Sequence, residues 1–413
     1  MLLDALLQQG PSYGLLVTVD KCEVFWPSGD QTVPEFPSEI KRVYQSEGGT
    51  TLLGSPVYGK DDFIDSTLAK VVAKVLNSQS HLQDLDNPQV ELHLLRSCLG
   101  SCTLNSLLRT VPPSLGSDQF VHFDKGLRRS LGVITHSSIS DSAWHQATLP
   151  LKVGGLGLKE AVPTSSAAFL GSCNFSRNLV SFFLDKEASN TTDLDDITNS
   201  PYVCIPGENH ARNILPKYLG SDTIPPNLTN ASQRQIQSRI DSHLLSNLKE
   251  GFSLRDQARI NTISTPHAGA WLKAIPNPKL GLAMLRHEHI LTCRYWLGIS
   301  IFPDSQQAAR CPCGHVMDCF GDHVLGCGHG PLRKKCYNAI SEVIWHALLV
   351  DNRDSKQEQK CGGESNNRIG DVFHPDFLEG RPAFFDVSVR NSMQPSYVYK
   401  AAIKPGAAAE AGE

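Results

Sequence analysis

The sequence has no strong excess of charge of either sign, and it has no long apolar run. Its 413 residues carry a formal net charge of −4, whereas a domain dedicated to nucleic acid is usually strongly basic. No apolar segment approaches the roughly 20 residues that a membrane-spanning helix needs. Residues 1–5 lack the basic start and the long apolar core of a secretory signal. We therefore expect no membrane partner, and whole-chain charge argues mildly against a pure nucleic-acid binder.

Disulfide bonds are not expected either, although the chain has twelve cysteines. Most of them are scattered, and one cluster lies between residues 311 and 327. In a chain without a secretory signal, close-spaced cysteine and histidine are typical of metal ligands. We therefore expect a reducing compartment, the nucleus or the cytoplasm. No small-molecule substrate is evident from the sequence.

The cysteine cluster predicts a structural zinc site. Its sequence is C-P-C-G-H-V-M-D-C-F-G-D-H-V-L-G-C, with Cys311, Cys313, His323 and Cys327 at Cys-x-Cys-x9-His-x3-Cys spacing. Thiolate and imidazole ligands this close in sequence can form a tetrahedral shell around Zn²⁺ without a large core. Three further side chains in or beside this stretch are rival ligands: His315, Cys319 and His329.

An acidic pair follows in a stretch that alternates as two strands. Asp371 and Asp386 lie within residues 367–390, with Gly380-Arg-Pro in the turn between the strands. Such a hairpin can direct both carboxylates at one Mg²⁺, a hard cation that prefers oxygen ligands. Asp376 is a rival for the first carboxylate, and Glu342 or Glu364 could supply an extra one.

Apolar periodicity predicts an α+β protein that is mostly helical. Short strands are expected at 13–19, 23–26 and 50–54, and the stretch 191–231 is rich in Asp, Asn, Pro and Ser, which predicts an exposed linker. We expect Trp144, Trp271 and Trp296 to be core residues rather than base-stacking platforms. Helices are expected at 3–9, from 61, across 92–99, 120–131, 142–149, 161–184, 232–252, 280–297 and 332–349.

Several motifs, in order, resemble the C-terminal half of a reverse transcriptase polyprotein from a non-long-terminal-repeat retrotransposon with a restriction-like endonuclease. The stretch from Gly14 to Glu23 resembles a late palm motif, and Leu53-Gly-Ser-Pro resembles the primer grip. The stretches Trp144-His-Gln-Ala-Thr-Leu-Pro and Cys293-Arg-Tyr-Trp-Leu-Gly resemble the connecting helices. The zinc ligands at 311, 313, 323 and 327, Arg368-Ile-Gly-Asp and Phe385-Asp-Val-Ser-Val match the knuckle and the nuclease core.

The resemblance implies a modular chain. The fold expected is a partial palm followed by helices, with a small α/β restriction-endonuclease-like domain at the C-terminus. The expected segments are a palm remnant with the primer grip (1–60), a helical thumb or connection (61–190), a polar linker (191–231), a helical linker (232–300), a zinc knuckle (301–330) and a truncated restriction-like endonuclease domain (331–413).

The resemblance also implies roles for single residues. Lys21, Arg109, Arg128 and Arg129 would contact nucleic acid, although without the upstream carboxylates Lys21 is better interpreted as a surface lysine after a strand. The family's polymerase carboxylates have no counterpart here, which predicts a fragment without polymerase activity. The nuclease's usual Asp-x-Lys is also missing, because Ser388 stands where lysine is expected. Relatives can place the lysine on the next helix. Lys400 is therefore the first candidate for the residue that stabilises charge in the transition state, and Lys404 is the second.

The function expected is therefore that of a retrotransposon-derived chain with a zinc knuckle and a Mg²⁺-dependent endonuclease-like domain acting on DNA. The partners would be DNA, RNA or both. The alternatives are a non-catalytic, zinc-dependent nucleic-acid-binding module and a decayed relic.

Overall fold

The computed structural model describes residues 2–25, 39–43, 48–188, 206–302, 310–329, 331–351, 354–358 and 370–410. The protein is mostly helical with small sheets, so the broad expectation of a helix-dominated α+β chain is confirmed. None of the helices in these ranges is long and apolar enough to cross a bilayer. Backbone contacts divide the chain into two compact units. The first comprises residues 1–84, 97–130 and 159–243, and the second comprises residues 85–96, 131–158 and 244–413.

The first unit begins with short elements. A parallel pair and an antiparallel hairpin form its strands, and the hairpin turns at Leu53 and Gly54, both with positive φ. The expected strand at 13–19 is absent, because a 3₁₀ turn occupies Gly10–Tyr13 and Gly14 adopts the left-handed conformation. A strand requires a pairing partner, and Leu15 and Leu16 are instead exposed. The elements are α1 (Leu2–Gln9), β1 (Glu23–Phe25), β2 (Lys41–Val43), β3 (Gly49–Leu52) and β4 (Ser55–Gly59).

Helices form the rest of this unit. In the first long helix, Leu68, Val72 and Val75 recur at helical spacing and are buried, and two aspartates occupy the first turn. The carboxylate of Asp124 accepts the backbone N–H groups of Ala161 (2.6 Å) and Val162 (3.0 Å) where another long helix begins. The helices are α2 (Asp61–Ser80), α4 (Asn105–Thr110), most of α5 (Pro113–Thr135), α7 (Ala161–Ala188), α8 (Glu208–Leu219) and the first half of α9 (Gln233–Gly251).

Part of the stretch 191–231, which we expected to be an exposed linker, is folded. Helix α8 buries Ala211, Leu215 and Leu219 in a cluster with α7. These residues recur every four positions and give the helix one apolar face that its polar composition conceals. The buried carboxylate of Glu208 at its start binds two arginines, Arg177 and Arg212, at 2.6 and 2.7 Å. Residues 189–205 lie outside the described ranges.

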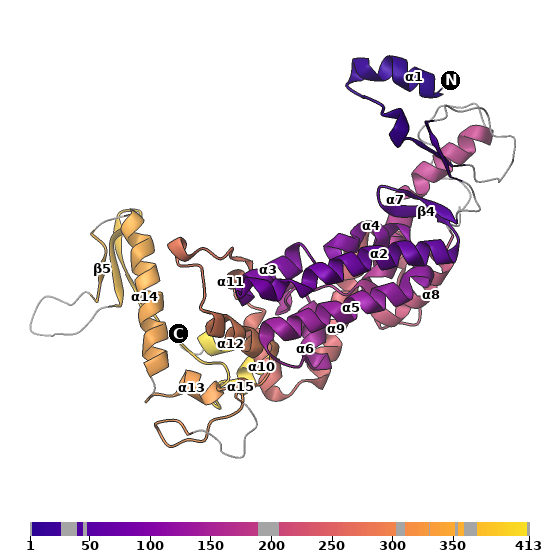
Figure 1. The fold of residues 1–413 in the computed structure, drawn as a ribbon. Coiled ribbons are helices and arrows are strands. Elements are labelled where there is room, and N and C mark those ends of the chain that lie inside the picture. The colour runs from indigo at the N-terminus through magenta and orange to yellow at the C-terminus, as the bar shows by residue number, and fades with distance from the viewer. Residues whose placement is uncertain are drawn as a thin grey trace, which may run out of the picture. The chain divides into compact units, whose positions relative to one another are not determined.

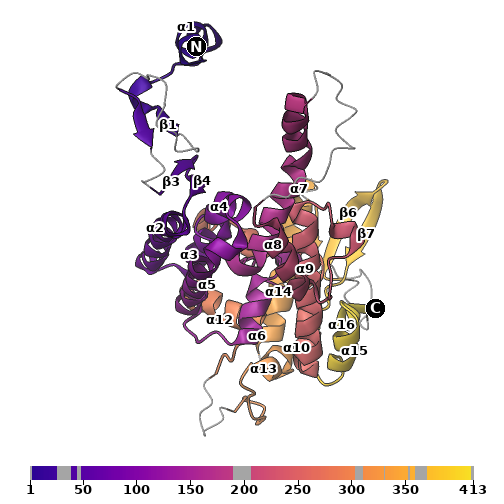
Figure 2. The ribbon, with the colours of Figure 1, turned by 90° about the vertical axis from the view of Figure 1, so that its right-hand side faces the viewer.

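The second unit combines helices with one antiparallel sheet of order β5-β6-β7. Helix α15 packs along α10, and α14 packs on β5 and β6 (Figures 1 and 2). Its helices are α3 (Pro88–Ser97), α6 (Asp141–Thr148), α10 (Leu254–Ile263), α11 (Ala270–Lys273), α12 (Arg286–Leu297), α13 (Asp322–Gly326), α14 (Pro331–Asp351), α15 (Val398–Ile403) and α16 (Ala407–Glu410). Its strands are β5 (Lys356–Gln357), β6 (Val372–Leu378) and β7 (Arg381–Phe385).

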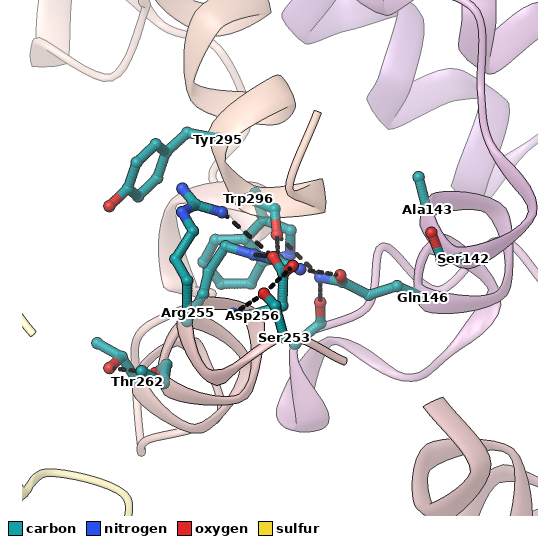
Figure 3. A network of polar contacts seen from close by, with 12 residues as sticks. Ser142, Ala143, Gln146, Ser253, Arg255, Asp256, Thr262, Tyr295 and Trp296 are labelled. Atoms are coloured by element: carbon teal, nitrogen blue, oxygen red, sulfur yellow. Dashed lines mark hydrogen bonds and ion pairs between the residues drawn. The ribbon is translucent and has the colours of Figure 1, made fainter. Parts of the chain in front are cut away.

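A buried arginine ties three of these helices together. The guanidinium of Arg259, whose side chain is 2% exposed, donates to Gln146 Oε1 (2.9 Å), to Asp256 Oδ1 (3.2 Å) and to the carbonyl of Trp296. Figure 3 shows these three partners, Gln146, Asp256 and Trp296. Gln146 in turn donates to that carbonyl and to the carbonyl of Gly154, both at 2.8 Å. The network links α6, α10 and α12, and nearly all of its buried polar groups are thereby paired.

The tryptophans agree with the expectation of core positions. Trp144 and Trp296 are buried. Trp271 is partly buried and meets the ring of Trp296 edge to face, with 5.7 Å between the ring centroids. These rings therefore pack the helical region of the second unit.

Candidate metal centre and carboxylate pair

The structure brings together the four side chains of the expected zinc site. One ligand atom from each of Cys311, Cys313, His323 and Cys327 lies within 4.8 Å of the others. The Sγ atoms of Cys311 and Cys327 are 3.6 Å apart, and Cys313 Sγ lies 3.1 Å from His323 Nε2. A tetrahedral shell with Zn–S bonds of about 2.3 Å has S–S edges of about 3.8 Å. The donor set and its spacing therefore fit one Zn²⁺.

Two tight turns create this cluster. The first carries the Cys-x-Cys pair: the N–H of Gly314, at φ +86°, donates to the carbonyl of Cys311 (2.7 Å), and the N–H of Cys311 donates to the carbonyl of His315 (2.9 Å). The second is at Gly321, at φ +77°, directly before α13. Helix α13 then presents His323, and Cys327 follows its last residue.

Asp318 fixes the start of α13. Its carboxylate accepts the backbone N–H groups of Phe320, Asp322 and His323 at 2.9–3.0 Å. Partial burial alone would raise the pKa of this carboxyl, but the three N–H donors outweigh it and lower the pKa. An ionised Asp318 thus stabilises the short helix that carries the imidazole ligand.

The rival ligands lie outside the cluster of four. The ring of His315 stacks on the ring of His323, with centroids 4.3 Å apart. The backbone carbonyl of Cys319 accepts the N–H groups of Ile301 and Phe302. His329 is exposed beyond the last ligand.

A second feature, which the sequence did not reveal, anchors the knuckle to the helices. Asp322, next to the ligand His323, binds Arg255 of α10 through two contacts of 2.5 and 3.0 Å and accepts the hydroxyl of Tyr295 of α12 at 3.0 Å. The Arg255 guanidinium also lies 3.7 Å from the ring centroid of Phe320. Burial and the charge of Asp322 raise the pKa of Tyr295, so it remains a hydroxyl donor. Figure 3 shows Arg255 and Tyr295 from close by.

The segment after the sheet also binds the knuckle. The side-chain amide of Asn391 donates to the carbonyl of Asp322, and that of Gln394 donates to the carbonyl of Gly326, both at 2.9 Å. Two carbonyls of α13 are thereby satisfied by side chains. The knuckle and residues 391–394 therefore form one hydrogen-bonded assembly.

The hairpin brings the expected acidic pair together. Val372 pairs with Phe385, so Asp371 and Asp386 flank one end of the β6–β7 ladder. The N–H of Asp371 donates to the carbonyl of Phe385 at 2.9 Å. The pKa of Asp386 is raised by a side-chain hydrogen bond with Asp371 and by that group's charge. The register of the ladder places these two residues opposite one another, with Asp371 buried and Asp386 exposed.

Both oxygens of Asp371 have partners within the protein. The N–H of Val387 donates to its Oδ2 at 2.6 Å, and the hydroxyl of Tyr337 on α14 donates to its Oδ1. The periodicity of α14 gave no sign that Tyr337 would face this carboxylate. These contacts fix the orientation of Asp371 and join α14 to the hairpin.

The candidate lysines do not lie on the hairpin. Lys400 is exposed on α15, which packs mainly on α10. Lys404 forms an ion pair with Glu410 at 2.7 Å. Glu342 lies 3.8 Å from His346 on the exposed side of α14. Glu364 and Arg368 lie outside the described residues.

The basic residues expected to contact nucleic acid lie on three elements of the first unit. Lys21 is exposed at the end of a 3₁₀ turn (Val19–Lys21), and Arg109 is exposed in the last turn of α4. Arg129 is exposed and Arg128 half-buried on α5. Their role in binding stays a prediction.

The chain as a whole matches no protein family model, no curated protein and no solved structure. The zinc-type cluster and the carboxylate pair are therefore the features of the chain that bear on its function.

Proposed function

We propose that the second unit is a nucleic-acid-processing module, in which a zinc knuckle stabilises the fold and Asp371 and Asp386 hold Mg²⁺ for phosphodiester hydrolysis in DNA. The position of the two aspartates opposite one another across the hairpin carries this proposal. Two carboxylates side by side repel one another, and either a proton kept by one of them or a bound cation relieves the repulsion. The resemblance to a retrotransposon protein with a restriction-like endonuclease agrees with the same assignment.

The chemistry of the pair suits a hard cation. Carboxylate oxygens are preferred ligands of Mg²⁺, and bound Mg²⁺ would offset negative charge on the scissile phosphate. Asp371 is held by Tyr337 and Val387, whereas Asp386 is exposed to an incoming strand. In this proposal Asp371 is the fixed ligand, Asp386 is the accessible one, and Lys400 remains the candidate charge stabiliser.

The zinc knuckle has a structural role in this proposal. It fixes α13, and through Asn391 and Gln394 it fixes the segment that follows the second aspartate. A four-ligand site without an open position is typical of structural zinc. Loss of zinc would therefore loosen the chain directly after Asp386.

Nicking of plasmid DNA by the purified full chain, loaded with Zn²⁺, tests the proposal. We expect Mg²⁺-dependent conversion of supercoiled to open-circular DNA, abolished in Asp386→Ala. The matched control is Asp376→Ala, which removes an exposed aspartate from the same hairpin. Absence of nicking by a folded, zinc-loaded chain would refute the nuclease. Loss of nicking in the control alone would move the first ligand to Asp376.

A non-catalytic nucleic-acid-binding module is the second candidate, and one observation favours it. Because both oxygens of Asp371 already have partners in the protein, its carboxylate could serve only to join α14 to the hairpin. Such a module would keep DNA binding in Asp386→Ala and lose it in Cys311→Ser. Fluorescence anisotropy with labelled DNA separates it from the nuclease.

A further inference from the structure

Helix α14 has apolar residues on two opposite sides. One side faces the sheet, where Ser341 is buried and Trp345 Nε1 donates to the carbonyl of Ser355 at 3.0 Å. An ordinary amphipathic helix would be polar on its other side. Here the other side carries a second apolar stripe.

This outer stripe has the spacing of a helix-pairing seam. Successive members are four, four, three, four and three residues apart, so they stay on one face over five turns, and from Cys336 onward the pattern repeats every seven residues. They span about 27 Å at 1.5 Å per residue. Val343 is 68% and Val350 90% exposed. The stripe consists of Leu332, Cys336, Ile340, Val343, Ala347 and Val350.

The charges of α14 oppose its own dipole. Its first turns contain Arg333, Lys334 and Lys335, all exposed, with no acidic residue in the first turn and no basic residue in the last. Positive charge destabilises the N-terminus of an isolated helix and stabilises a C-terminus. The same charges would be favourable beside the C-terminal end of an antiparallel neighbour, where the helix dipole is negative.

We propose that the outer stripe of α14 binds the same stripe of a second copy of this chain, with the two helices antiparallel. The stripe is symmetric about its centre: Leu332 would face Val350, Cys336 would face Ala347, and Ile340 would face Val343. Two of these pairs place a larger residue, Leu or Ile, against a valine, and the third places a small residue, Cys, against a small residue, Ala. A parallel pair would instead bring two basic helix starts together. This inference does not depend on the nuclease.

Sedimentation of the full chain under reducing conditions tests the pairing. We expect a concentration-dependent monomer–dimer equilibrium, and the double variant Val343→Glu, Val350→Glu should weaken it by more than about tenfold. Both side chains are exposed, so circular dichroism and thermal melting should remain unchanged. The matched control is Ile275→Glu, Ile403→Glu, which places the same charges at two exposed isoleucines outside α14 (70% and 68% exposed). This control should dimerise like the wild type.

A monomer at every concentration would overturn the proposal, as would a dimer that survives the α14 variant. Orientation is tested separately by Ala347→Cys, which places a thiol opposite the native Cys336. Antiparallel pairs should form an intermolecular bond between positions 336 and 347 under mild oxidation. Peptide mapping that finds only bonds between two copies of Cys336 would refute the antiparallel arrangement.

Discussion

The contact between Arg255 and Asp322 offers the sharpest test of how the knuckle is stabilised. The side chains are only 16% and 15% exposed, so solvent screens their attraction weakly. Arg255→Met removes two contacts of 2.5 and 3.0 Å to Asp322 and one of 3.2 Å to Asp256. Leaving a fully buried charge without its partner costs about 3–5 kcal/mol. Because Asp322 keeps its hydrogen bond from the Tyr295 hydroxyl and is partly exposed, we expect Arg255→Met to lower the free energy of unfolding by about 2–3 kcal/mol.

Urea unfolding followed by tryptophan fluorescence measures this loss. Four of the five tryptophans, at positions 144, 271, 296 and 345, lie in the second unit, so the signal reports mainly on that unit. The matched control is Arg381→Met, which removes an exposed arginine from β7 of the same unit. Because Asp322 adjoins the candidate ligand His323, the affinity for zinc, measured by competition with a chelator, should also be about 10–100-fold lower in Arg255→Met. An unfolding free energy and a zinc affinity equal to those of the wild type would refute the reasoning.

Three further predictions follow from the buried polar groups and the metal cluster. Burial lowers the pKa of His289 from 6.5 to about 4. As the pH falls, the unfolded chain therefore binds a proton at this histidine before the folded chain does. The free energy of unfolding is thus unaffected above pH 6.5 and falls by up to about 3 kcal/mol as the pH approaches 4. Between these pH values the midpoint of urea unfolding should fall less in His289→Gln than in the wild type. The same fall in both proteins would contradict a lowered pKa of His289. Arg259→Met should cost about 3–5 kcal/mol in urea unfolding, because Asp256 and Gln146 lose their shared partner; a near-neutral effect would show that the network contributes little. Metal analysis should find one zinc ion per chain, lost in Cys311→Ser and kept in Cys98→Ser, which changes an exposed cysteine elsewhere; equal zinc in both variants would refute the site.

The sequence by itself determined the local features. The spacing from Cys311 to Cys327 predicted the four side chains that meet, because a zinc knuckle is built within one short loop. Apolar periodicity located most of the long helices, and Gly380 marked the turn between β6 and β7. These features depend on neighbours within a few residues, which a sequence displays directly.

Tertiary structure alone decided the rest, because each remaining feature joins residues far apart in the chain. Asp322 contacts Arg255 across 67 positions, and Tyr337 contacts Asp371 across 34. The polar stretch that folds as α8 required α7 as its partner. In α14 both faces are apolar, so the pattern could not say which of them packs on the sheet and which remains exposed.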